Sequence, residues 1–137
     1  DAIILAKAGI ERLELNESYI DLNFLPAIGQ GIIAVQCRSD DRETKNLLES
    51  IKNNELLTMI EIERKIIRSL NATCNSALSI SSKIKDDTFE TEIEIYGENE
   101  IIYEKFISDL NSIDKSIKMA INNITIKGGL KLLDENN

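Results

Sequence analysis

Alternating apolar and polar positions in the second half of the chain predict an antiparallel sheet. Between residues 88 and 96 every second position is apolar or Thr, and Glu fills most of the positions between them. One face of this strand is therefore expected to be packed and the other solvated. Similar segments precede and follow it, separated by short clusters of Asp or of Gly, Glu and Asn that are typical of turns. The predicted strands cover residues 77–85, 88–96 and 101–107.

Apolar residues at every third or fourth position predict helices on either side of this sheet. One helix is expected over residues 55–70, capped by Asn54, and another is expected to begin at Asp109 or Ser112. A short final helix is expected near residues 130–133. From residue 55 onward the order helix, three-stranded meander, helix predicts a compact α+β unit.

The first fifty residues show a different pattern. Residues 2–13 are rich in Ala and apolar residues and are interrupted by Gly9, which predicts a short helix. The run 32–37 is almost wholly apolar, as in a strand that is buried on both faces, so Cys37 at its end is expected to be buried. Asp40 is placed to cap a helix that follows.

Charge and length exclude two broad classes of partner. The 137 residues include 16 Lys and Arg against 24 Asp and Glu, for a net charge of −8, so the basic surface of a nucleic-acid-binding protein is absent. No apolar run approaches the roughly 20 residues that span a bilayer. The chain has no starting Met and no cationic leader, and we expect it to begin inside a longer protein.

The absence of histidine removes the Ser-His-Asp and Cys-His arrangements and every zinc site that contains His. Two cysteines, Cys37 and Cys74, are too few for an all-cysteine zinc site, so no metal is expected. Such sparse cysteine in a chain of this size suits a reducing, cytoplasmic setting.

Few side chains remain as candidates for chemistry. Cys74 follows a predicted helix within the small polar residues 71–76, where a thiol is accessible as a nucleophile or anchor; a half-buried structural cysteine is the alternative. Arg12 lies near a predicted helix end and suits a carboxylate or phosphate, or is simply a surface residue. Gly29-Gln30-Gly31 only weakly imitates a phosphate loop, since it lacks the Lys-Ser/Thr pair.

Four segments together resemble the porphobilinogen deaminase family. Residues 1–13 resemble a family helix with its Ala-Gly and Arg-Leu pairs. Residues 25–38 resemble its Leu-Pro-Ala-Val-Gly-Gln-Gly crossing and the Glu-Cys-Arg strand that follows. Glu63-Arg64 resembles the start of the cofactor-attachment signature, and Cys74 falls at the attachment cysteine.

The departures from the family pattern surround Cys74. Ala72 and Thr73 stand where the family usually has Gly-Gly, and Ala77 stands where it usually has Pro. We expect the chain to be stiffer before the cysteine and looser after it.

The resemblance implies an α+β and α/β architecture. The C-terminal three-stranded antiparallel sheet packed by helices would be preceded by pieces of two α/β domains that resemble periplasmic binding proteins. Residues 1–24 would end the second α/β domain. Residues 25–50 would cross to the first and give it a strand and a helix, and residues 51–137 would form the cofactor-anchoring domain.

The resemblance also implies a function. The family's transferases polymerise four porphobilinogen units into hydroxymethylbilane, with release of ammonia, in tetrapyrrole and heme biosynthesis. Cys74 would hold a dipyrromethane cofactor by a thioether, and Arg12 would pair with a pyrrole carboxylate. Gln30 and Gly31 would line the cleft. The catalytic aspartate is expected upstream of this chain, so the fragment alone is expected to be inactive.

The full-length enzyme is expected to be a cytoplasmic monomer with porphobilinogen as its small-molecule substrate. The fragment is expected to be able to self-associate, because an unpaired strand or an exposed meander edge can pair with a second copy. Two alternatives stay open: a non-catalytic binding or regulatory module that dimerises, and a degenerate, inactive relative of the deaminases.

Overall fold

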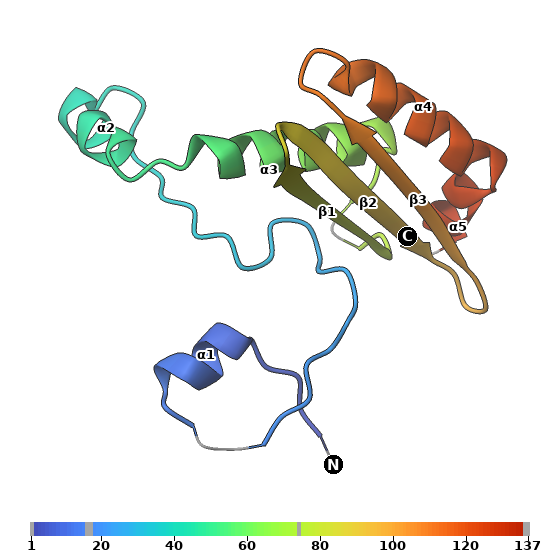
Figure 1. Cartoon of the computed structure of the whole chain (residues 1–137), viewed down its shortest axis with the longest axis horizontal. Helices are drawn as coiled ribbons and strands as arrows, with labels where there is room; N and C mark the ends of the chain where they lie inside the picture. Colours follow the sequence, from blue (N-terminus) through green and yellow to red (C-terminus); the bar gives the residue numbers. More distant parts are fainter. Residues whose placement is uncertain (1, 16–17, 74, 136–137) are drawn as a thin grey trace.

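A three-stranded antiparallel sheet with helices over one face forms the centre of the molecule. The computed structural model describes residues 2–15, 18–73 and 75–135. The strands lie in the order β1-β2-β3, and the predicted α+β class is confirmed (Figure 1). They are β1 (Leu78–Lys85), β2 (Thr88–Tyr96) and β3 (Ile101–Ser108).

The turns and the alternation of β2 explain the sheet. Asp86 and Asp87 both have positive φ, of 48° and 61°, as the tight turn between β1 and β2 requires. Buried and half-buried residues alternate along all of β2, and Ile93 and Ile95 are fully buried. The strand prediction was therefore correct to within a residue at each end.

Two long helices cover the apolar face of the sheet. The first is α3 (Asn54–Ser69), whose cap is Asn53 rather than the predicted Asn54: the Asn53 side chain accepts a hydrogen bond from the N–H of Leu56 at 2.9 Å. The second is α4 (Ile113–Ile126), which Ser112 precedes, and a short α5 (Gly129–Glu135) completes the chain's described part.

One core joins these elements. α3 contributes Ile62 and Ile66, α4 contributes Ile117 and Ile124, and all four side chains are at most 4% exposed. Thr91 is fully buried among them, and its hydroxyl lies 3.1 Å from that of Ser82, so the buried polar atoms satisfy each other.

The N-terminal helices stand outside this core. They are α1 (Lys7–Arg12) and α2 (Arg42–Glu49), and neither contains a buried residue. Figure 1 shows both away from the sheet, connected by long irregular segments. The cap of α2 is Asp41 and not the predicted Asp40; its carboxylate accepts the Thr44 N–H at 3.0 Å, and this bond lowers the pKa of Asp41.

The predicted strand over residues 32–37 is not formed. Its backbone is irregular, and Ile33 and Val35 are 87% and 61% exposed. Within the described residues the three strands pair only with one another, so this run has no neighbour to bond with. Cys37 is consequently half-buried and not buried as predicted. The periplasmic-binding-protein-like pieces are not confirmed.

Within residues 2–15, 18–73 and 75–135, no helix has the length and apolar character needed to cross a membrane.

Candidate functional site

Two consecutive turns shape the segment Pro26–Gly31, which we call the crossing segment. The Gln30 N–H bonds the Ala27 carbonyl at 3.0 Å, and the Ile32 N–H bonds the Gly29 carbonyl at 3.2 Å. Gly29 and Gly31 take the third position of these turns with φ of 70° and 81°. That position requires positive φ in type II turns, which glycine adopts without steric cost.

The crossing segment docks on the C-terminal unit. Ile28 packs against the hydrophobic core as a partly buried residue. Beside it a cavity of about 170 Å³ is enclosed by three parts of the chain: the crossing segment, α3 and β1. Its polar lining comes from Gln30, Glu63, Ser81 and Ser82. The structure thus brings one predicted site residue, Gln30, against the unit to which Cys74 belongs.

Glu63 of α3 is the buried charge at this junction. Only 7% of the residue is exposed, and its carboxylate accepts the Ser82 N–H of β1 at 2.8 Å. The backbone N–H of Gly29, in the crossing segment, also stabilises the charged carboxylate. Burial raises the pKa of Glu63, and the interactions with the Ser82 and Gly29 amides oppose that shift without cancelling it. Among the described residues no basic side chain forms an ion pair with it.

The side-chain amide of Gln30 has hydrogen-bond donors that no described residue uses. Its side-chain oxygen accepts the Ala27 N–H at 3.2 Å, which fixes the orientation of the amide. The amide nitrogen makes no hydrogen bond to any described residue, so its two N–H donors are open to a ligand. Gly31 is exposed directly after it.

Arg12 is placed separately. It lies in the last turn of α1, is exposed, and forms no ion pair or hydrogen bond by its side chain with the described residues. No hydrogen bond or ion pair joins it to Gln30 or Gly31, and α1 lies apart from α3 and the sheet in Figure 1. The chain alone therefore presents an available guanidinium but does not assemble it with the crossing segment.

Cys74 lies outside the described residues, but the chain before it is clearly positioned. Asn71 follows α3 with a positive φ of 51°. The Ala72 N–H bonds the Ile67 carbonyl at 3.1 Å and the Asn71 N–H bonds that of Arg68 at 3.3 Å, which together form a Schellman motif. Ala72 also packs against the core. A methyl group here is consistent with the expected stiffening before the cysteine.

Hydroxyl groups connect the residues on either side of Cys74. The Thr73 N–H donates to the Ser76 hydroxyl at 2.9 Å, and the Ser76 N–H donates to the Thr73 carbonyl at 3.2 Å. After the cysteine, the Ala77 carbonyl accepts the Tyr96 N–H of β2 at 2.9 Å. This bond ties Ala77 to the sheet and so opposes the expected loosening after Cys74. It uses the carbonyl of residue 77, which a proline would also supply, so the absence of proline does not affect it.

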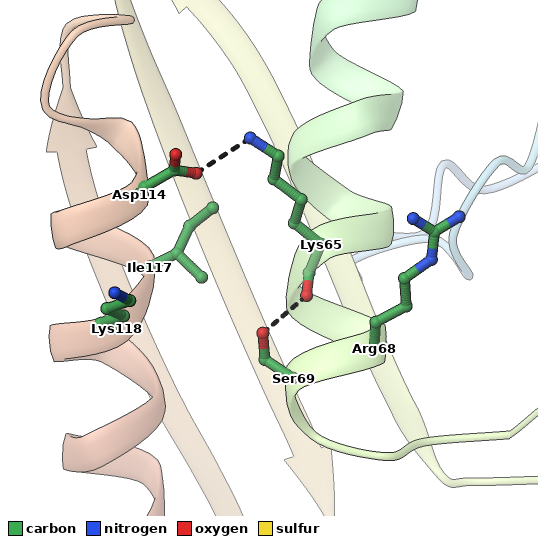
Figure 2. A pocket seen from close by; sticks show the side chains of 6 residues that line it. All are labelled: Lys65, Arg68, Ser69, Asp114, Ile117 and Lys118. Atoms are coloured by element: carbon green, nitrogen blue, oxygen red, sulfur yellow. Dashed lines mark hydrogen bonds and ion pairs between the residues drawn. The ribbon is translucent and has the colours of Figure 1, made fainter.

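A larger groove of about 330 Å³ lies between α3 and α4 (Figure 2). Lys65 bonds Asp114 across it at 2.9 Å, which lowers the pKa of Asp114, and the two side chains are 50% and 71% exposed. Exposed ion pairs of this kind contribute about 0–1 kcal/mol. Ser69 donates to the Lys65 carbonyl at 2.9 Å. We interpret the groove as a surface contact between the two helices.

The sequence contains one further signal of this site, at position 63. Position 63 falls within the apolar stripe of α3, between Met59 and Ile66, yet it holds a glutamate. A charged residue in an apolar stripe marks a buried carboxylate that needs partners. Among the described residues, no group of three or more His, Cys, Asp or Glu is arranged to hold a metal ion.

Comparison with known proteins identifies the relatives. Residues 1–46 match the family model described as "Porphobilinogen deaminase, dipyromethane cofactor binding domain". A porphobilinogen deaminase of Coxiella burnetii is 41% identical over 93 residues, which are 65% of this chain and 30% of that protein. One of Staphylococcus aureus is 37% identical over 102 residues, 71% of this chain and 32% of its own length. The chain thus spans about a third of the curated relatives that it matches.

The domain that the family model describes binds a dipyrromethane cofactor, and residues 1–46 match it. Over the matched segments the chain resembles a fragment of a porphobilinogen deaminase. The segment matched by the family model contains Arg12, Gln30 and Gly31 and ends before Cys74.

Proposed function

We propose that this chain is the C-terminal part of an enzyme that polymerises four porphobilinogen units into hydroxymethylbilane, with release of ammonia. The observation that carries the proposal is the match of residues 1–46 to the cofactor-binding domain. Deaminases that are 37–41% identical to the chain over 93 to 102 residues extend this similarity. The enzyme would be a transferase of tetrapyrrole biosynthesis. Its sparse cysteine supports a cytoplasmic setting.

Cys74 is the proposed attachment point for dipyrromethane, by a thioether. Sulfur suits this role because it is a soft nucleophile for carbon and the C–S bond resists hydrolysis. Thr73 and Ser76, on either side of it in the sequence, are joined to each other by hydrogen bonds. When bound, the cofactor would supply the primer to which pyrrole units are added.

The described residues fit such a group. Dipyrromethane carries acetate and propionate carboxylates, and Arg12 offers a guanidinium without a partner among the described residues. Gln30 offers two amide N–H donors that the described chain leaves unused, and Gly31 exposes its backbone beside them. We propose these three residues as cofactor- or substrate-binding, with the proton for ammonia release supplied by an aspartate outside this chain.

The proposed division of the chain follows its packing. Residues 51–137 would be the cofactor-anchoring domain, and the core formed by α3, the sheet and α4 supports this assignment. Residues 1–24 would belong to a second α/β domain and residues 25–50 to a first one. The exposed Ile33 and Val35 support a missing neighbour for the latter segment.

The role of Arg12 is tested by Arg12→Leu in the full-length protein. Loss of a charge-assisted hydrogen bond costs about 1.5–3 kcal/mol, so we expect kcat/KM for porphobilinogen to fall by about ten- to a hundredfold. Thermal unfolding should not change, because Arg12 is exposed. Arg42→Leu, an exposed arginine on α2, is the matched control and should leave kcat/KM unchanged. Equal kcat/KM in the two variants would contradict this role.

One observation favours a second function, a module that dimerises through the sheet. On the edge strand β3, Ile101 and Ile107 are 60% and 61% exposed and Tyr103 is 44% exposed. An apolar edge of this kind can pair with a second copy. A dimer that persists in the full-length protein without covalent cofactor would favour this module over the deaminase.

A further inference from the structure

Glu63 is a charged residue in a position that packing alone would give to an apolar side chain. It is 7% exposed, while Ile62 and Ile66 beside it on α3 are 2% and 0% exposed. A buried carboxylate without a cation costs free energy that an apolar residue of similar size would not. The raised pKa of Glu63 agrees with this, since burial outweighs the stabilisation by the Ser82 and Gly29 amides. Its two partners indicate why a carboxylate is present.

Those partners lie on two separate parts of the chain. The Ser82 N–H belongs to β1, inside the C-terminal unit, and the Gly29 N–H belongs to the crossing segment. Gly29 has a φ of 70°, a backbone conformation that glycine adopts without steric cost. The orientation of its amide depends on this conformation. Gln30 and Gly31, the proposed ligand-binding residues, follow immediately. The Glu63 side chain thus interacts both with β1 and with the residue that precedes the proposed ligand-binding pair.

The cavity beside Glu63 depends on the same connection. Its walls come from the crossing segment, α3 and β1, and Gln30 and Glu63 both line it. Ile28 is the one apolar anchor of the crossing segment that packs against the core, and it is only partly buried. Apolar packing therefore does little to fix the orientation of this segment. Polar interactions with a carboxylate are directional and can fix it.

We propose that Glu63 is a positioning residue that sets the crossing segment, and with it Gln30 and Gly31, at a fixed place on the unit that carries Cys74. The inference that this positioning serves catalysis rests on the proposed function. The positioning itself is independent of any cofactor and can be measured on the chain alone.

Amide hydrogen exchange of the chain tests the positioning with three variants. Glu63→Met keeps the size but removes both acceptors, and Glu63→Gln keeps one acceptor oxygen. Glu61→Met is the matched control, since Glu61 is exposed on the same helix. We expect the Gly29 amide to exchange roughly tenfold faster or more in Glu63→Met, partial rescue in Glu63→Gln, and no change in Glu61→Met. Amides at the centre of β2, such as that of Ile93, should stay as slow as in the wild type.

Two results would overturn the proposal. One is unchanged exchange at Gly29 in Glu63→Met. The other is an equal rise at Gly29 and Ile93, which would give Glu63 a role in the fold as a whole. In the full-length enzyme the same variant should keep the covalent cofactor and lose kcat/KM for porphobilinogen. Faster Gly29 exchange without that loss would support the positioning and count against its catalytic use, while absence of any covalent cofactor in the wild type would count against the proposed function alone.

Discussion

Cys74→Ser in the full-length protein is expected to abolish covalent attachment of dipyrromethane and, with it, the turnover of porphobilinogen. A serine hydroxyl is a far weaker nucleophile than a thiol at neutral pH, and it ionises far less readily. The described chain offers no histidine as a base that could activate it. The measurement is the rate of porphobilinogen consumption by the purified variant, together with its intact mass.

Cys37→Ser is the matched control. Cys37 is the other cysteine of the chain, and it is half-buried in the irregular segment before α2. Its replacement should leave both the adduct and the turnover in place. Loss of the adduct in both variants, or in neither, would contradict the assignment to Cys74.

The isolated chain is expected to show two levels of protection from hydrogen exchange that differ by roughly a thousandfold or more. Amides of β2 and α4 open only when the shared core unfolds, because their side chains are its most buried members. Residues 2–15 and 32–41 contribute no buried side chain and should exchange at nearly the rate of an unfolded chain. The crossing segment should lie between these levels.

Residue-resolved exchange, with the mass of the chain from light scattering, measures this difference. Strong protection of residues 32–37 in a dimer would show that this run finds a partner strand in a second copy, as its apolar pattern allows. Uniform protection throughout a monomer would contradict the proposed boundary near residue 51.

Elements that pack against other described elements of this chain could be predicted from its sequence. The strand predicted for residues 32–37, which has no partner strand among the described residues, could not. The alternation along residues 88–96 and the stripe of α3 are local patterns that the core satisfies. The run 32–37 has an equally clear strand pattern, but a strand needs a neighbour to bond with. The predicted cap of α2 lies one residue too early and that of α3 one residue too late. In each case two adjacent identical residues, Asp40-Asp41 or Asn53-Asn54, offer the same capping side chain.

The residues of the candidate site were proposed from the sequence and stay a prediction, and the connections between them could not be predicted. The structure shows that Gly29 and Gly31 each take part in a turn, and that Gln30 between them lines the cavity. The sequence indicates Glu63 only as part of a motif, because Gly29 and Ser82 are distant from it in sequence and interact with it through backbone N–H groups. Only the three-dimensional arrangement shows that its carboxylate connects them.

The central claim, that this chain anchors a dipyrromethane cofactor, is tested most directly by mass spectrometry of the full-length protein. The intact protein is expected to carry one covalent adduct of dipyrromethane mass, and peptide mapping is expected to locate it on the peptide that contains Cys74. An unmodified Cys74 peptide in a protein that consumes porphobilinogen, or an adduct on Cys37 instead, would contradict the account.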